Sequence, residues 1–461
     1  MRLLTSHIPG PMFALLAAEI ALITFVYLGT VFVFLDVSPE VWLFYDDGIS
    51  RLAVLVLGIV LGLHFHDLYG KLRIRSLFEL FQQVCVVIGL AFLIQALLSY
   101  VAPELQFPRT MMLFGSAILL VAIPSWRWAY SGYVARGLVA ERVLFLGCNP
   151  IASQVAGRIR ERPEFGMSVI GFVDDASPAE APGSPDRIGL LSEFKDIVAR
   201  TRPDRIVIGM TERRSRLPVL DLLDIGFSGI RIEDAATAFE WAFGRIPTTE
   251  LRPSQLIFTR ELGPRPSTVK LQSAYSWLFA LAGFTLTLPV MMLVAVLIKL
   301  TSRGPVLYRQ ERVGRNGRCF QLLKFRSMRV DAEARTGAVW ARPNDPRVTL
   351  LGGWLRKLRL DELPQFINVL KGDMSLVGPR PERPEFVKTL SEKIPFYPQR
   401  HCIKPGITGW AQINHKYGDS IEDTIAKLEY DLYYIKNMSL TLDAYVVFQT
   451  IKVVLLSRGG Q

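Results

Sequence analysis

Long apolar stretches constrain this chain more than any other feature, because about 20 consecutive apolar residues are enough to cross a bilayer as a helix. Half of the 461 residues are apolar, so membrane segments are expected. We predict four transmembrane helices within residues 1–135, at about 11–35, 49–68, 77–100 and 108–130. The first run contains Glu19, which we expect to face the helix bundle or an interface rather than lipid.

Basic residues between the apolar runs predict how the chain is oriented, because Lys and Arg favour the cytoplasmic side. The loop at 36–48 has acids and no Lys or Arg. Basic residues gather instead in the second loop and after the fourth run, at Lys71, Arg73, Arg75, Arg127, Arg136 and Arg142. We therefore expect the N-terminus, the second loop and everything after residue 130 to lie in the cytoplasm.

Residues 140–265 read as alternating strands and helices. Buried strands are expected at 142–147, 169–173, 205–209 and 230–232, with a Pro/Ser/Ala loop at 176–187. Strands that alternate with helices form parallel sheets, so we predict a Rossmann-like module.

The first turn of this module runs from Gly147 to Ala152 and keeps only one glycine of the dinucleotide fingerprint. Asn149 stands where the second glycine would allow a pyrophosphate to approach. A nucleotide or CoA-type ligand and a ligand-free structural or regulatory role are both left open. The module has no Tyr-x-x-x-Lys pair, so its sequence does not support dehydrogenase-type chemistry.

A fifth apolar run, 271–298, contains no charged residue and is long enough to span. Both of its flanks are basic, however, so a spanning helix would leave one basic cluster outside. Pro289 lies near the middle, where it removes a backbone hydrogen bond and can kink a helix. We expect 270–300 to be a re-entrant membrane helix broken at Pro289, with Thr285 and Thr287 bonding freed carbonyls. A fifth span with a tolerated proline is the alternative.

Residues 301–461 form a basic, turn-rich last domain. A hairpin should turn at Asn316-Gly317, and an extended strand at 321–328 would place Lys324 and Arg326 on one face. Residues 363–370 look helical with Pro364 in the first turn, so Asp361 and Glu362 would lie at or just before the helix N-terminus.

The chemistry of this domain centres on 355–386, where six cations surround the Asp361–Glu362 pair. An isolated acid pair is most often part of a salt-bridged surface helix. Here the neighbouring basic residues favour a site in which the charge of a phosphate is neutralised, so that a carboxylate can attack it. The net charge of +11 also fits anionic partners. No nucleic-acid-binding motif is visible, so nucleic acid is not expected as a partner.

Two helices should complete the domain. The stretch 421–436 is amphipathic and carries Asp431. The run at about 438–456 is apolar but too short for a confident span, and we interpret it as an interfacial helix or one packed on the domain.

Four motifs together resemble the bacterial sugar transferase family of polyprenyl-phosphate hexose-1-phosphate transferases, also called phosphoglycosyl transferases. They are KFRSM, LRLDELPQFINVLKGDMSLVGPRPERPEF, KPGITGWAQIN and YDLYYIKN. The match covers about 270–457, and the four spans with a Rossmann-like module resemble the large members of this family.

The resemblance implies transfer of a sugar-1-phosphate from a UDP-sugar to undecaprenyl phosphate, with release of UMP. Asp361 would be the nucleophile that forms a phosphosugar intermediate, and Glu362 its partner, with both holding Mg²⁺. Other positions matched by the motifs would bind substrate phosphates or matter at the site, namely Lys324, Arg326, Arg356, Arg380 and Asp431. The family's re-entrant helix breaks at a Ser-Pro or similar pair, whereas this chain has Leu288-Pro289.

The implied setting is the inner membrane of a bacterium, with the catalytic domain on the cytoplasmic face in contact with membrane lipids. A homodimer and polysaccharide assembly proteins are further partners that we consider. Two other functions remain open, a membrane-anchored nucleotide-sugar dehydratase or epimerase and a non-enzymatic membrane scaffold of polysaccharide assembly. Bound NAD would favour the dehydratase, and a degenerate acid pair would have favoured the scaffold.

Overall fold

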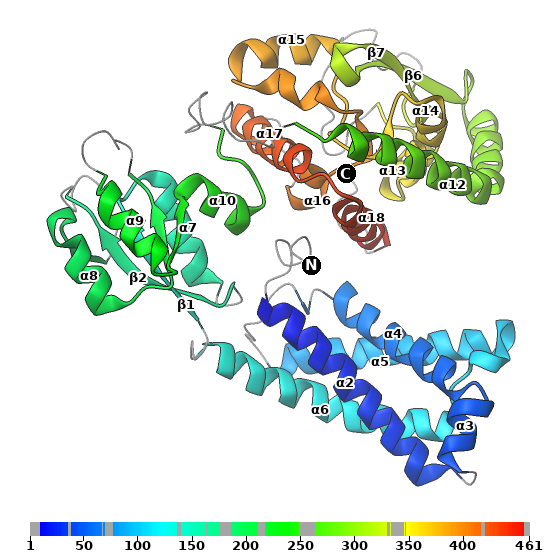
Figure 1. The fold of residues 1–461 in the computed structure, drawn as a ribbon. Coiled ribbons are helices and arrows are strands. Elements are labelled where there is room, and N and C mark those ends of the chain that lie inside the picture. The colour runs from blue at the N-terminus through cyan, green and yellow to red at the C-terminus, as the bar shows by residue number, and fades with distance from the viewer. Residues whose placement is uncertain are drawn as a thin grey trace. The chain divides into compact units, whose positions relative to one another are not determined.

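The computed structural model of the chain is shown in Figure 1. It divides into two compact units, Met1–Ala238 and Phe239–Gln461. The residues that it describes are 10–35, 38–66, 68–69, 77–135, 140–162, 165–175, 186–210, 217–248, 263–329, 332, 345, 347–415 and 420–455.

The first 135 residues form the predicted bundle of apolar helices. Four of them are long, namely α2 (Gly10–Phe34), α4 (Gly48–Phe65), α5 (Leu77–Val101) and α6 (Arg109–Ala135). The short helix α3 (Pro39–Tyr45) lies between the first two. All four long helices are apolar and long enough to cross a membrane, and they lie where the four spans were predicted. Most of the basic second loop, 70–76, lies outside the described residues.

Glu19 faces the inside of this bundle and is fully buried. The Arg127 guanidinium lies 2.6 Å from its carboxylate, and the Tyr69 hydroxyl donates to the same group. Arg127 also donates to the Leu68 carbonyl at 2.6 Å. A buried carboxylate needs a cation of this kind, and the sequence reading had not paired Glu19 with Arg127.

The Rossmann-like module contains a five-stranded parallel sheet with strand order β3-β2-β1-β4-β5. Its strands are β1 (Glu141–Leu146), β2 (Met167–Val173), β3 (Arg187–Gly189), β4 (Arg205–Ile208) and β5 (Arg231–Asp234). The helices between and after them are α7 (Pro150–Glu161), α8 (Phe194–Thr201), α9 (Val219–Phe227) and α10 (Ala235–Phe243). The parallel α/β fold is as predicted, although β3 was missed because three residues carry too little pattern to mark a strand.

The boundary between the two units falls inside α10, after Ala238. This is earlier than residue 265, where the sequence suggested that the Rossmann-like module ends. The residues from Phe239 onward therefore belong to the compact unit that contains the acid pair. Residues 249–262 lie outside the described part of the chain.

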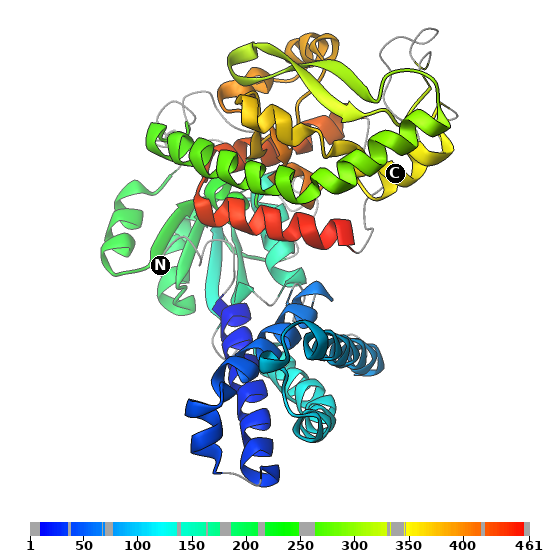
Figure 2. The ribbon, with the colours of Figure 1, turned by 90° about the vertical axis from the view of Figure 1, so that its right-hand side faces the viewer.

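The fifth apolar run forms α12 (Pro266–Thr301), a single helix of 36 residues. Helical structure continues through Pro289, so the expected break is not a gap in the helix. Figure 2 shows instead that α12 is bent near its middle, as expected of a helix with an internal proline. The Thr285 and Thr287 hydroxyls donate to the Leu281 and Gly283 carbonyls rather than to the Thr285 carbonyl that Pro289 leaves without its usual partner.

Both halves of α12 pack into the second unit. Ala280 clusters with Leu322, Val369 and Met374, and an added Cβ on Gly283 would lie 2.8 Å from the Phe366 ring. Met291, Val294 and Ile298 cluster further along with Phe325 and Leu355. Near its start, the Gln272 amide donates to the Val377 carbonyl at 3.2 Å. The helix is thus part of the core of this unit along nearly its whole length.

The rest of the unit is small strands and helices around α12. The predicted hairpin is present as antiparallel β6 (Leu307–Val313) and β7 (Cys319–Phe325), with Asn316 at a φ of 55° in the turn. The following elements are α13 (Leu350–Lys357), the 3₁₀ turn η5 (Leu360–Glu362), α14 (Gln365–Lys371), β8 (Ser375–Val377), α15 (Pro384–Lys393), the 3₁₀ segment η6 (Tyr397–Cys402), β9 (Gly406–Thr408), α16 (Trp410–Asn414), α17 (Ile421–Lys436) and α18 (Leu440–Leu455).

Candidate active site

The acid pair lies in a tight turn between two helices. Thr349 caps α13 by accepting a hydrogen bond from the Gly352 amide at 2.9 Å. The chain then reverses at Arg359, whose φ is 55°, and passes through η5 into α14. Asp361 and Glu362 therefore lie just before the N-terminus of α14, as the sequence predicted.

Glu362 gathers three cations from three parts of the chain. Its Oε1 lies 2.9 Å from the Lys324 ammonium of β7 and 3.3 Å from the Arg380 guanidinium, which follows β8. Its Oε2 lies 3.8 Å from Arg359. Burial raises the pKa of Glu362, but these cations outweigh it and hold the pKa well below the ordinary value. Glu362 is thus ionised and organises the positive charge of the site.

Asp361 has a different environment, although it is the next residue. Its side chain is buried, and burial is the largest influence on its pKa, which lies above the ordinary value. The Glu362 carboxylate raises the pKa further, whereas Lys324, Arg356 and Arg380 oppose the rise. Neighbouring carboxylates with opposite shifts are suited to different tasks. Both carboxylates are buried, but only at Glu362 do the neighbouring cations outweigh the effect of burial on the pKa.

The two basic residues of KFRSM do not share one environment. Lys324 reaches Glu362, but β7 ends at Phe325, so the alternation of faces does not extend to Arg326. Arg326 is buried and donates to the Ser302 and Arg303 carbonyls at 3.0 Å. It secures the end of α12, and its predicted phosphate-binding role stays a prediction.

Arg356 lies on the last turn of α13, just before the acid pair. Its Nε donates to the Ser327 hydroxyl at 3.0 Å, which ties α13 to the segment that follows β7. An added Cβ on Gly352 would lie 1.9 Å from the Ser327 carbonyl oxygen, so this close approach requires glycine. The charge of Arg356 acts on Asp361 from this position.

Asp431 is buried on α17 and pairs with Arg400, a residue that was not predicted from the sequence. The Arg400 guanidinium donates to the Asp431 carboxylate at 2.8 and 3.1 Å, to the Tyr397 hydroxyl at 2.9 Å and to the Arg380 carbonyl at 3.0 Å. Asp431 is therefore connected to the acid pair through Arg400 and Arg380. A buried aspartate on an amphipathic helix requires a cation, and this requirement was the available signal for Arg400.

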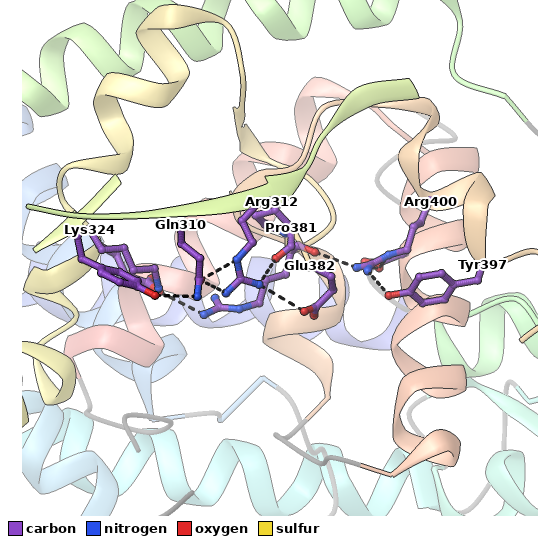
Figure 3. Close-up of polar contacts among 11 residues, drawn as sticks. Gln310, Arg312, Lys324, Pro381, Glu382, Tyr397 and Arg400 are labelled. Carbon is purple, nitrogen blue, oxygen red and sulfur yellow. Dashed lines mark hydrogen bonds and ion pairs between the residues drawn. The ribbon is translucent and has the colours of Figure 1, made fainter. Parts of the chain in front are cut away.

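A second arginine holds the same loop from the other side. Arg312 of β6 donates to the Pro381 carbonyl at 2.9 Å and lies 3.5 Å from the Glu382 carboxylate, while Gln310 accepts from its guanidinium at 2.6 Å (Figure 3). The Val313 amide donates to the Glu382 carbonyl at 2.9 Å. The backbone from Arg380 to Glu382 is thus held by groups far away in the sequence.

The sequence predicted the two carboxylates of the pair as ligands for Mg²⁺. Among the described residues, no group of three or more His, Cys, Asp or Glu side chains is placed to hold a metal ion. Mg²⁺ commonly binds one or two carboxylates together with substrate phosphates and water. Asp361 and Glu362 fit such a site only if a phosphorylated substrate completes it.

Two backbone amides at the N-terminus of α7 already have partners within the chain. The Cys148 amide donates to the Asp174 carboxylate at 2.7 Å, and the Asn149 side chain accepts from the Ala152 amide at 2.7 Å. Pro150 has no amide hydrogen to offer. The donors that usually bind phosphate at this position are therefore used within the chain.

These features define a membrane protein with a buried carboxylate in a cluster of cations, an arrangement suited to phosphate chemistry. Residues 267–457 match the family model described as bacterial sugar transferase, and residues 64–210 match a CoA-binding domain. One relative is the UDP-glucose:undecaprenyl-phosphate glucose-1-phosphate transferase of Xanthomonas campestris pv. campestris, which is 32% identical over 356 residues, or 72% of this chain and 71% of the relative. The chain belongs to the bacterial sugar transferase family.

Two other relatives match over different extents. The UDP-N-acetylgalactosamine-undecaprenyl-phosphate N-acetylgalactosaminephosphotransferase of Aeromonas hydrophila is 48% identical over 218 residues, or 47% of this chain and 51% of the relative. The undecaprenyl-phosphate glucose phosphotransferase of Komagataeibacter xylinus is 36% identical over 339 residues, or 70% of this chain and 60% of the relative. The matched regions thus span 51% and 60% of the length of these two relatives.

Proposed function

We propose that the protein is an enzyme that transfers a sugar-1-phosphate from a UDP-sugar to undecaprenyl phosphate, with release of UMP. The observation that carries the proposal is the buried Asp361 carboxylate, under the charges of Lys324, Arg356 and Arg380. A carboxylate attacks an anionic phosphorus only where cations neutralise the phosphate. The names of the relatives support the substrate class.

The reaction proceeds in two displacements. A carboxylate oxygen of Asp361 forms a bond to the β-phosphorus of the UDP-sugar, and the bond from that phosphorus to the bridging oxygen breaks. UMP leaves with the electron pair. A phosphate oxygen of undecaprenyl phosphate then attacks the same phosphorus, and the aspartyl oxygen–phosphorus bond breaks to restore Asp361. The product is the lipid diphosphate sugar.

Glu362 prepares the site for this chemistry. It keeps Lys324 and Arg380 beside Asp361 before substrate arrives, so little reorganisation is needed when the diphosphate replaces it as their partner. Mg²⁺, held by Asp361, Glu362 and substrate phosphates, would further neutralise the diphosphate. Chelation with EDTA should therefore abolish UMP release, and added Mg²⁺ should restore it.

The same proposal places the site at the cytoplasmic face of the bacterial inner membrane. Both halves of α12 pack against one soluble unit, which supports re-entry because the two ends of a spanning helix face opposite sides of the bilayer. Beside α12, helix α13 exposes Leu350 and Trp354, and Leu358, which directly follows the helix, is exposed as well; the three are four residues apart in turn. Such an apolar stripe next to basic residues suits the membrane interface, where a lipid-linked phosphate lies.

Re-entry is tested by labelling a cysteine placed at Arg303, next to the end of α12. The Arg303 side chain is exposed, and Arg326 contacts its carbonyl, which the substitution retains. The exposed Cys319 is first replaced by serine. An impermeant thiol reagent should label Arg303→Cys only in inside-out vesicles. Labelling from the periplasmic side would refute re-entry.

The decisive activity experiment measures UMP release with a panel of UDP-sugars and undecaprenyl phosphate. The wild-type protein should release UMP with at least one sugar, and Asp361→Asn should release none while remaining folded. Turnover by Asp361→Asn would exclude it as the nucleophile. Conversion of a UDP-sugar without the lipid acceptor would favour the dehydratase or epimerase, and inactivity with every sugar would favour the scaffold.

A further inference from the structure

A segment of ten residues that precedes the family match is part of the unit that contains the acid pair, and it packs against the helices of that unit. We call residues 239–248, at the end of α10 and just after it, the docking segment. They belong to the second compact unit, whereas the sugar transferase match begins at residue 267. The segment packs against α17 and α16, and its Ile246 is buried together with Trp410 and Leu432 in the same hydrophobic cluster.

Glu429 of α17 is the main anchor of the docking segment. Its Oε1 accepts from the Thr248 amide at 3.0 Å and from the Thr248 hydroxyl at 3.3 Å. Its Oε2 pairs with Arg245 at 3.2 Å, and its backbone carbonyl accepts from the Ile246 amide at 3.1 Å. The Glu429 side chain is only 7% exposed, so these bonds form away from water, where they are strong.

Two further contacts hold the docking segment, one with α17 and one with α16. The Lys436 ammonium of α17 donates to both carboxylate oxygens of Glu240 on α10, at 2.8 and 2.9 Å. The Trp410 indole donates to the Gly244 carbonyl at 2.7 Å, in a turn where Gly244 has a φ of 65°. The docking segment thus contacts α17 at both ends of the stretch that includes Asp431.

The opposite face of α17 leads to the acid pair. Glu429 and Asp431 are two residues apart on a helix, or about 200° around its axis. Asp431 holds Arg400, Arg400 donates to the Arg380 carbonyl, and the Arg380 guanidinium reaches Glu362. The docking segment and the acid pair are therefore linked through α17, with polar contacts on each of its two faces and the helix backbone between Glu429 and Asp431.

We propose that Glu429 is a positioning residue for sugar-phosphate transfer, and that the docking segment fixes α17 so that Arg380 stays beside the acid pair. The inference rests on the proposed function, and it makes residues outside the family match part of the catalytic machinery.

The test is a double-mutant cycle in the full-length protein, with kcat and KM measured by UMP release. Glu429→Ala should lower kcat/KM by about two- to thirtyfold, the usual range for residues that act through others, with most of the loss in KM for the UDP-sugar. Glu429→Gln, which keeps the acceptor for Thr248, should recover much of the loss. Glu422→Ala, at an exposed position on the same helix, is the matched control and should be unchanged.

The cycle combines Glu429→Ala with Arg380→Lys. If Glu429 acts through Arg380, the double variant should be no worse than Arg380→Lys alone. Multiplied losses would overturn the proposal. If Glu429→Ala does not fold, Glu240→Gln enters the cycle in its place.

A second measurement does not depend on turnover. Hydrogen exchange in peptides that cover residues 374–386 should be faster in Glu429→Ala than in Glu422→Ala, because the Arg380 loop is less well held. Unchanged exchange there would also overturn the proposal. If the two variants show this difference in exchange but the wild-type protein releases no UMP, the proposed function is refuted and the role of Glu429 in holding the Arg380 loop still stands.

Discussion

The Arg400–Asp431 pair allows the sharpest prediction about how the site is supported. The two side chains are 6% and 2% exposed, so their charges are compensated almost entirely by each other and by the protein. Removing one partner of such a pair typically costs about 3–5 kcal/mol, because a buried charge is left behind. We expect Asp431→Asn to destabilise the second unit by this amount.

The cost can be expressed as a melting temperature. For a unit of 150–250 residues, 1 kcal/mol shifts Tm by about 2–4 °C. Asp431→Asn should therefore lower Tm by roughly 6–20 °C, measured by intrinsic fluorescence in detergent micelles or nanodiscs. A shift below about 2 °C would contradict the burial of the pair.

A double variant separates stability from function. Arg400→Met with Asp431→Leu removes both charges and fills the same space, and apolar replacements of this kind often restore stability. It should recover most of the lost Tm but not the turnover, because the Arg380 carbonyl loses the guanidinium donor that fixes it. Full turnover by this double variant would show that Arg380 is positioned without Arg400.

Three further outcomes follow from the site. Glu362→Gln should lower kcat/KM by roughly 10- to 150-fold, since charge-assisted hydrogen bonds contribute about 1.5–3 kcal/mol. An effect of only twofold in the UMP assay would refute the role of Glu362 in holding Lys324 and Arg380. Because the pKa of Asp361 is raised, its carboxylate becomes protonated as pH falls through a value above the ordinary one of about 4. We therefore expect kcat/KM, measured from pH 4 to 8, to decline on the acid side with a midpoint above that value. In Glu362→Gln this midpoint should move to lower pH. Trp354→Glu on the exposed face of α13 should raise KM for undecaprenyl phosphate but not for the UDP-sugar, and an equal effect on both would argue against an interfacial α13.

Local patterns predicted the elements that local forces determine. The helix expected at 421–436 has those same bounds as α17, because Ser420 and Asp423 form a capping box ahead of an amphipathic run. The hairpin turn at Asn316 was predictable for the same kind of reason. The placement of Asp361 and Glu362 before α14 followed from Pro364, which suits the start of a helix.

The supporting contacts of the site could not be predicted in this way. Arg400 is 31 residues from Asp431, and Arg312 is 70 residues from Glu382, so neither pair leaves a periodic signal. For Arg326, the alternation of side chains along a strand was extended too far, because β7 ends at Phe325, one residue before it. The contacts of the docking segment with Glu429 were also not predictable, because they join residues about 180 positions apart.

Helix α12 has a consequence for how this protein is made. In the proposed membrane placement, the same 36 residues provide both the apolar surface that faces lipid and the core against which Phe325, Val369 and Leu355 pack. Deleting the helix to obtain a water-soluble enzyme would remove the centre of the fold, and keeping it without lipid would expose Leu286 and Leu300, which are 82% and 78% accessible. Insertion into the membrane and completion of the second unit are therefore one event, and an active protein should be obtained only where both occur together.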